Sequence, residues 1–148
     1  MLFIFRFHLL FSEKYLAMKK ILIVEDNHDI QTQLKWGLSK GLDILQAFNR
    51  SDAIALFIKN RPPVVTLDLG LPPEEDNASE GLACLREILK KAPETRVIVV
   101  TANNDSEVAR EATKTGAYAY YLKPVDKDIL RAAIQKALNL SGSEEDDS

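Results

Sequence analysis

Five polar side chains of types that can bind a metal ion or an anion each follow an apolar stretch of the chain. They are Glu25, Asp26, Asp68, Thr101 and Lys123. Carboxylate oxygens are hard ligands that suit Mg²⁺, and a lysine ammonium or a hydroxyl can donate hydrogen bonds to phosphate oxygens. Together these residue types favour phosphoryl transfer, a reaction in which the protein mainly positions groups and neutralises charge.

The three carboxylates would repel one another if they met at one place. Such a cluster is stable at neutral pH only when protons or a cation compensate its charge, and Mg²⁺ and Lys123 could do so. We expect Asp68 to be the nucleophile, because attack of a carboxylate on phosphorus gives an acyl phosphate. Glu25 and Asp26 would then hold the metal ion.

Apolar runs with little polar alternation precede these residues and are typical of buried strands. They comprise Ile21–Val24, Val64–Leu67, Val97–Val100 and Ala117–Leu122. A fifth run, Leu42–Ala47, alternates more and indicates an edge strand. Apolar spacing and capping residues predict a helix after each strand. The first helix is ended by Gly41, and the second runs from Ser51 or Asp52 to just before Arg61. The third runs from Ser79 to Ala92, the fourth from Asp105 to Thr115, and the fifth from about Asp126 onward.

Five alternating strands and helices predict an α/β fold with a five-stranded parallel sheet, because parallel neighbours need a crossover and these crossovers are helices. With right-handed crossovers and Leu42–Ala47 at an edge, the simplest solution is a doubly wound, flavodoxin-like three-layer sandwich of strand order 2-1-3-4-5. The order reverses between strands one and three. Those strands end in the acidic pair and in Asp68, so topology and chemistry predict the same crevice.

The domain organisation is predicted to be simple, since 148 residues fit one domain. Residues 1–18 form an N-terminal extension outside the domain: either an upstream stretch preceding a start at Met18, or a short interfacial or partner-binding segment. Residues 19–139 form the domain. Residues 140–148, with their serines and acids, are predicted to be an acidic disordered tail or linker.

Composition excludes several classes of function. The acids of Glu144–Asp147 carry −4 of a net charge of −3, so the rest of the chain sums to +1 and shows no basic stripe of the kind that nucleic-acid binding requires. Arg6 and His8 interrupt an N-terminal apolar stretch that is too short to span a bilayer. Cys84 is the only cysteine, which fits a reducing cytoplasm.

Taken together, four segments make the chain resemble the receiver domain of two-component response regulators over about residues 19–139. The segments are Ile21–Asn27, Thr66–Pro72, Val97–Ala102 and Tyr120–Pro124. Lys123 follows Thr101 by 22 residues (123 − 101), which matches the interval usual in that family. Any one of these residues alone has an ordinary structural explanation, such as a strand-end or helix cap. Their joint order and spacing make the resemblance specific.

The resemblance implies a role for each site residue. Asp68 would accept a phosphoryl group from the phosphohistidine of a sensor histidine kinase or phosphotransfer protein. Glu25, Asp26 and Asp68 would bind Mg²⁺, with the backbone carbonyl of Gly70 completing the metal site. Thr101 and Lys123 would contact the phosphoryl group. The chain would thus be a phosphoacceptor, not an enzyme in the usual sense, with self-catalysed phosphotransfer and dephosphorylation only.

The resemblance also implies a conformational switch. Tyr120 matches an aromatic that turns inward when Thr101 moves, and the Lys123–Pro124 peptide bond is commonly cis in the family. The helix from Asp105 offers the core only Val108 and a few alanines, so weak packing suits it to this movement. The face built by the fourth helix, fifth strand and fifth helix would signal to an output domain or partner protein, and the expected output is transcriptional. A homodimer is also compatible with the resemblance.

The stretch Leu71–Gly81 departs from the family because it is longer than the usual turn after the phosphoacceptor, and it adds three acids near the site. It resembles the receivers of sigma-factor-dependent transcription regulators in exosortase-associated (PEP-CTERM) systems. Two other functions stay open. One is a Mg²⁺-dependent phosphohydrolase, although that class commonly places a second Asp where Gly70 stands. The other is a receiver-like interaction module that is never phosphorylated.

Overall fold

The computed structural model describes the backbone of residues 18–146 and the side chains as far as residue 139. The N-terminal extension predicted over residues 1–18 therefore lies almost wholly outside the described residues. Among the helices that the structure describes, none is long and apolar enough to cross a membrane.

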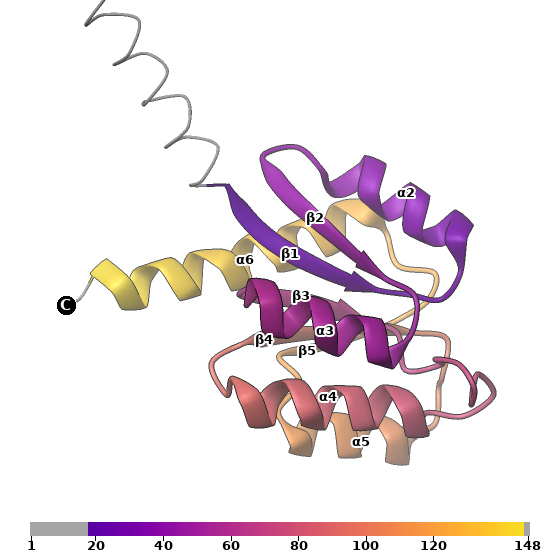
Figure 1. Cartoon of the computed structure of the whole chain (residues 1–148). Coiled ribbons are helices and arrows are strands. Elements are labelled where there is room, and N and C mark those ends of the chain that lie inside the picture. The colour runs from indigo at the N-terminus through magenta and orange to yellow at the C-terminus, as the bar shows by residue number, and fades with distance from the viewer. Residues whose placement is uncertain (1–17, 147–148) are drawn as a thin grey trace, which may run out of the picture.

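Five parallel strands form one sheet, and a helix follows each strand (Figure 1). The strands are β1 (Lys19–Val24), β2 (Leu42–Ala47), β3 (Val64–Leu67), β4 (Arg96–Thr101) and β5 (Ala119–Leu122). The helices are α2 (His28–Leu38), α3 (Arg50–Asn60), α4 (Ser79–Lys91), α5 (Ser106–Thr115) and α6 (Lys127–Asp146). The sheet order is β2-β1-β3-β4-β5, which confirms the predicted doubly wound α/β fold and the edge position of β2.

Two apolar layers flank the sheet because side chains of a strand alternate between its faces. Leu22 and Val24 of β1 pack with α3, α4 and α5, whereas Ile21 and Ile23 pack with α2 and α6. Figure 1 shows the same division, with α3, α4 and α5 below the sheet and α6 on its other side. All four residues of β3 are buried, as the mostly apolar run predicts for a strand covered on both faces.

Side-chain caps fix where α2, α3 and α5 begin, and Asp126 caps α6 in the same manner. Asn27 accepts a hydrogen bond from the backbone N–H of Ile30 at 3.0 Å, which starts α2 directly after the acidic pair. Asp105 starts α5 in the same way. At α3 the predicted cap was wrong: Asn49, and not Ser51 or Asp52, provides the capping oxygen, because an extended Asn places its side chain over the first free N–H groups.

Several boundaries differ from the sequence-based expectation by a few residues. Helix α2 ends at Leu38, and Gly41, with φ +76°, turns the chain into β2. Strand β5 begins at Ala119 and not at Ala117, because the N–H of Ala117 closes the end of α5 on the carbonyl of Ala112. Helix α6 continues to Asp146, through residues predicted to be disordered. Extending an existing helix costs far less than starting one, so serine and glycine there need not end it.

Helix α5 is held by few apolar contacts, as predicted. Ala112 is its one buried residue, and Val108 is only partly buried against the same core. By contrast, α4 buries Leu82, Leu85 and Ile88. Helix α5 is therefore the easier of the two to displace, since little apolar surface has to be exposed.

Candidate functional site

Three acidic side chains converge where β1 and β3 end. The register pairs Val24 with Leu67, so the residues that follow emerge side by side. The N–H of Asp68 donates to the carbonyl of Val24 at 2.9 Å, which extends the ladder by one residue. Carboxylate oxygens of Glu25, Asp26 and Asp68 all lie within 4.8 Å of one another. The switch point of the sheet thus collects the acids that the sequence analysis placed there.

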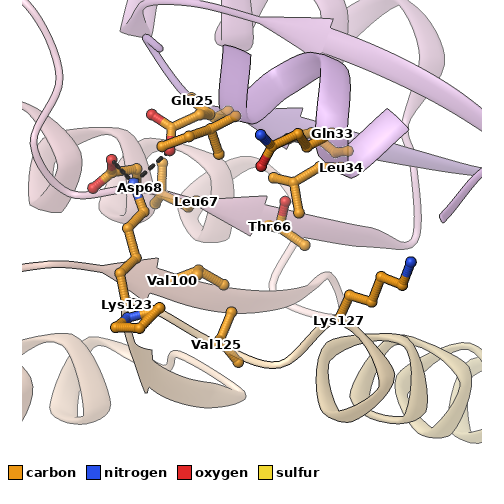
Figure 2. Close-up of a pocket in the computed structure, with 14 residues that line it drawn as sticks. Glu25, Gln33, Leu34, Thr66, Leu67, Asp68, Val100, Lys123, Val125 and Lys127 are labelled. Atoms are coloured by element: carbon orange, nitrogen blue, oxygen red, sulfur yellow. Dashed lines mark hydrogen bonds and ion pairs between the residues drawn. The ribbon is translucent and has the colours of Figure 1, made fainter. Parts of the chain in front are cut away.

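Lys123 brings a positive charge to this cluster from the loop after β5. Its Nζ lies 2.8 Å from Oδ2 of Asp68 and also forms an ion pair with Oε1 of Glu25 (Figure 2). The backbone N–H of Lys123 donates to the carbonyl of Thr101 at 2.9 Å, so the lysine is anchored to the end of β4. One ammonium group therefore contacts two carboxylates from two different strands.

Burial shapes the titration of the Glu25–Lys123 pair. Glu25 is 3% exposed, and desolvation raises its pKa to about 7, even though Lys123 opposes the shift. The Asp26 hydrogen bond and the Asp68 charge contribute to the same rise. Burial alone would lower the pKa of Lys123, but its hydrogen bonds to Asp68 and Glu25 raise it overall. The lysine therefore stays protonated, while Glu25 can lose or gain a proton near neutral pH.

The donor set fits a hard divalent cation. Three carboxylates and one ammonium leave an excess negative charge of two when every acid is ionised, which one Mg²⁺ would neutralise. Asp26 is more exposed than Glu25 and Asp68, so the cluster is open on its side. Mg²⁺ usually keeps several waters and takes one or two protein carboxylates, which suits this half-open arrangement.

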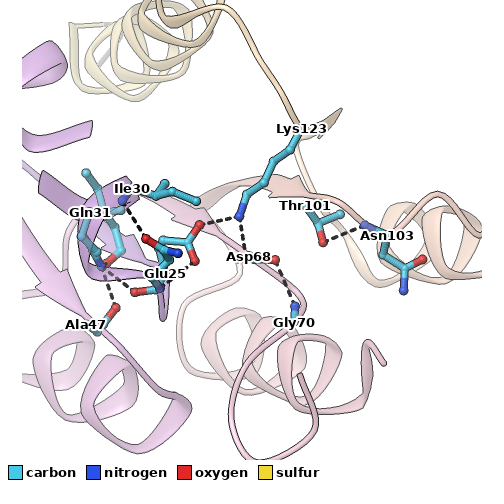
Figure 3. Close-up of polar contacts among 11 residues, drawn as sticks. Glu25, Ile30, Gln31, Ala47, Asp68, Gly70, Thr101, Asn103 and Lys123 are labelled. Atoms are coloured by element: carbon cyan, nitrogen blue, oxygen red, sulfur yellow. Dashed lines mark hydrogen bonds and ion pairs between the residues drawn. The ribbon is translucent and has the colours of Figure 1, made fainter. Parts of the chain in front are cut away.

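Thr101 and Tyr120 both contact the loop after β4. The hydroxyl of Thr101 accepts a hydrogen bond from the N–H of Asn103 at 3.3 Å (Figure 3). The hydroxyl of Tyr120 donates to the carbonyl of Asn103 at 3.0 Å. Both predicted switch residues thus bond the same loop residue, and the structure places the Thr101 hydroxyl on this loop and not on Asp68.

The loop that follows Asp68 is tightly folded over Gly70. The N–H of Gly70 donates to Oδ1 of Asp68 at 3.0 Å, which fixes the carboxylate from the side opposite Lys123. A Cβ at position 70 would lie 2.9 Å from the carbonyl oxygen of Glu75. The longer loop therefore folds back onto the turn that follows Asp68. The Pro72–Pro73 peptide bond within it is cis, as is Lys123–Pro124.

A cavity of about 420 Å³ opens between α2 and the start of α6, next to the acidic cluster (Figure 2). Its walls are mostly apolar and include Ile30, Leu34, Val100 and Val125. Asp68 and Lys123 line it as well. The carboxylate of Asp68 is therefore reached from a crevice with one charged and one apolar side.

Two polar residues that the sequence analysis did not select are part of the site. Asn103 bonds both predicted switch residues, as described above. Gln31 is 1% exposed, and its amide bonds the backbone beside Glu25. The sequence did contain a signal for Gln31. Leu38 follows it by seven residues, which is about two turns of a helix, so the two residues lie on the same helix face. Nothing comparable marks Asn103, a loop residue.

Comparison with known proteins gives one consistent result. The model of the family "Response regulator receiver domain" matches residues 21–135. The sporulation initiation phosphotransferase F of Bacillus subtilis is 32% identical over 126 residues, which cover 84% of this chain and 98% of that protein. The regulatory protein AtoC of Escherichia coli is 34% identical over 125 residues, and the chain spans only 26% of its length.

Solved structures agree with the sequence comparison. A CheY-like response regulator receiver domain protein from Methanospirillum hungatei superposes with a TM-score of 0.80 at 27% identity. The match covers 86% of this chain and 99% of that one.

Proposed function

The chain belongs to the response regulator receiver domain family of two-component systems, and we propose that its Asp68 is the phosphoacceptor. The observation that carries this proposal is the surroundings of Asp68. Its carboxylate lies among two further acids and accepts from Lys123 at 2.8 Å. Few reactions other than phosphoryl transfer require a buried carboxylate, a cation site and a lysine that contact one another.

The proposed reaction transfers a phosphoryl group from a phosphohistidine to Asp68. One carboxylate oxygen of Asp68 forms a bond to phosphorus as the phosphorus–nitrogen bond breaks, and the electron pair leaves with the imidazole nitrogen, which then takes up a proton. The donor is a sensor histidine kinase or a phosphotransfer protein. Gly70 N–H and Lys123 hold the two oxygens of Asp68, so the carboxylate is oriented before the donor arrives.

Glu25, Asp26 and Asp68 would hold the Mg²⁺, with the backbone carbonyl of Gly70 as a further ligand. When bound, Mg²⁺ supplies positive charge to the oxygens of the transferring phosphoryl group. Lys123 would add a second positive charge. The hydroxyl of Thr101 would add a hydrogen-bond donor once its side chain turns away from Asn103. The chain is a stoichiometric acceptor under this proposal, with no turnover beyond its own phosphorylation and dephosphorylation.

Phosphorylation would be read out at the face formed by α5, β5 and α6. If Thr101 turns towards the phosphoryl group, Asn103 loses one bond and the Tyr120 contact to the same residue is free to change. Helix α5, with Ala112 as its one buried residue, would move at little cost. This face would then bind an output domain or a partner protein, and a homodimer is compatible with it.

The identity of the output rests on the relatives. NtrC of Salmonella typhimurium, 30% identical over 118 residues that cover 24% of its length, is named a DNA-binding transcriptional regulator. We therefore propose a transcriptional output in a cytoplasmic signalling pathway. The long loop over Gly70 keeps open the proposed likeness to exosortase-associated regulators. Its acids, Glu74, Glu75 and Asp76, are exposed and could select the phosphodonor.

Incubation with Mg²⁺ and acetyl phosphate tests the phosphoacceptor proposal. Intact-mass measurement should show the addition of one phosphoryl group, which chelation of Mg²⁺ prevents. Asp68→Asn should abolish the addition, because asparagine keeps the acceptor oxygen for Gly70 but not the nucleophile. Glu94→Gln, at an exposed acid before the start of β4, is the control and should be labelled like the wild type. Equal labelling of Asp68→Asn would refute the assignment.

A further inference from the structure

Gln31 is a buried polar side chain at the meeting point of β1, β2 and α2. Its amide nitrogen lies 3.0 Å from the carbonyl oxygen of Ile23, 3.1 Å from that of Glu25 and 2.8 Å from that of Ala47 (Figure 3). These carbonyls lie at the ends of β1 and β2, and the carbonyl of Ala47 also accepts from the N–H of Glu25 at 3.0 Å. Gln31 therefore adds side-chain hydrogen bonds where the two strands end, including one to the carbonyl of Glu25, the residue that follows β1.

The amide of Gln31 is satisfied at both ends. Its nitrogen carries two protons for three acceptors, so at least one proton is shared. Its oxygen accepts from the amide nitrogen of Gln46 at 3.1 Å, and Gln46 also bonds the backbone carbonyl of Gln31 at 3.3 Å. This pairing fixes which end of the Gln31 amide points at the strand carbonyls. A donor is needed there, and Gln46 ensures that a donor is presented.

The backbone of Glu25 is held on both sides by these contacts. Its N–H donates to the carbonyl of Ala47 at 3.0 Å, and its carbonyl accepts from Gln31. The peptide planes before and after Glu25 are both restrained, so the directions of the Glu25 side chain and of the following Asp26 are fixed. Gln31 does not belong to the acidic cluster that would hold the metal.

We propose that Gln31 is a positioning residue for the metal site: by tying the ends of β1 and β2 together it aims Glu25 and Asp26, and so sets the affinity for Mg²⁺. The inference rests on the proposed Mg²⁺ site and extends it to a residue with no contact to the metal. Partners of this kind commonly change metal affinity by an order of magnitude, because ligands that must first be ordered bind less well.

The substitution Gln31→Met tests this role, since methionine has a similar length but donates no hydrogen bond. Titration of the metal-free protein with Mg²⁺ alone, followed by calorimetry, should show about tenfold weaker binding. Gln46→Met leaves the Gln31 amide in place but frees its orientation. It should weaken binding in the same direction by a smaller factor, and it keeps the test available if Gln31→Met does not fold.

Two controls separate positioning from general destabilisation. Ile88→Val removes a methyl group from the buried face of α4, on the opposite side of the sheet. It should lower stability without changing the Mg²⁺ affinity. Gln135→Met makes the same chemical change at an exposed position of α6 and should leave both quantities unchanged.

The possible outcomes distinguish the inference from the proposed function. Wild-type affinity in both Gln31→Met and Gln46→Met, with binding abolished in Asp26→Asn, would overturn the role of Gln31 while the metal site stands. Weaker binding in Ile88→Val to the same extent would also overturn it, because stability alone would then explain the effect. Absence of Mg²⁺ binding by the wild type would overturn the metal site and the inference together.

Discussion

The ammonium nitrogen of Lys123 lies 2.8 Å from a carboxylate oxygen of Asp68, although 55 residues separate the two in the chain. The same nitrogen bonds Glu25, so one side chain joins the ends of β1 and β3 to the loop after β5. Lys123 thereby competes with a metal ion for two carboxylates while it orients the one that reacts. Removing the Lys123 ammonium should therefore change the Mg²⁺ affinity and the rate of phosphorylation in opposite directions.

Lys123→Met should therefore tighten Mg²⁺ binding but slow the reaction. Removing a positive charge from three carboxylates favours a cation, whereas loss of an oriented charged donor should slow phosphorylation by acetyl phosphate on the order of 100-fold. Calorimetry at about pH 8.5, where Glu25 is ionised, and time-resolved mass measurement provide the two quantities. A parallel loss of Mg²⁺ affinity and rate would show that Lys123 mainly maintains the fold of the site.

Glu25 should give the metal-free protein a recognisable dependence of stability on pH. Because burial raises its pKa from 4.5 to about 7, the folded state holds the proton in a range where the unfolded state has lost it. Stability from this group is then complete below about pH 4.5 and falls as the pH rises towards 7. Denaturant unfolding in the presence of a chelator should show that the free energy of unfolding of Glu25→Gln rises relative to that of the wild type as the pH increases across this range. A difference that does not change with pH would contradict the raised pKa.

Gly81 should tolerate no side chain, because α4 crosses the turn after Asp68 there. A Cβ at this position would lie 2.2 Å from the Cα of Leu69, so Gly81→Ala must displace backbone and should cost about 3 kcal/mol. The matched control is Gly37→Ala in α2, where a Cβ would meet only the Lys127 side chain at 3.5 Å. That change should be neutral or stabilise by up to about 1 kcal/mol. Equal effects in denaturant unfolding would show that the crossing is looser than described.

Tyr120→Phe should separate phosphorylation from its readout. The change removes the hydroxyl that donates to Asn103 and costs about 1 kcal/mol or less, while Asp68 and its neighbours keep their contacts. Phosphorylation should proceed as in the wild type, but the NMR shift changes that acetyl phosphate produces in α5 and β5 should shrink. Tyr121→Phe is the control, since Tyr121 packs with the α2 and α6 layer and its ring is retained. Identical shift changes in both variants would exclude Tyr120 as a switch.

Sequence reasoning recovered what depends on short-range pattern and on topology. Unbroken apolar runs such as Val97–Val100 predicted the strands, and right-handed crossovers then predicted the order that puts Asp68 beside the acidic pair. It could not recover contacts that depend on side-chain direction. The Gln31 amide reaches carbonyls of two strands, and the Thr101 hydroxyl turns to Asn103, only because of the local backbone geometry.

Loop geometry was also beyond the sequence. The stretch after Asp68 was recognised as long and acidic, but its return over Gly70 depends on a carbonyl of Glu75 that no composition rule places. Near the end of α6, serine and glycine residues predicted that the helix stops before them, but the helix continues through them to Asp146. In both cases packing and helix propagation outweighed the local preferences of the residues.

The most direct test of the central claim is to locate the phosphoryl group chemically. Borohydride reduces an aspartyl phosphate to homoserine, so protein treated with Mg²⁺ and acetyl phosphate and then reduced can be mapped by peptide mass spectrometry. We predict homoserine at position 68 and at no other acid of the cluster. Homoserine at position 26, a reduced glutamyl product at position 25, or an unmodified Asp68 in protein that carries a phosphoryl group would contradict the account.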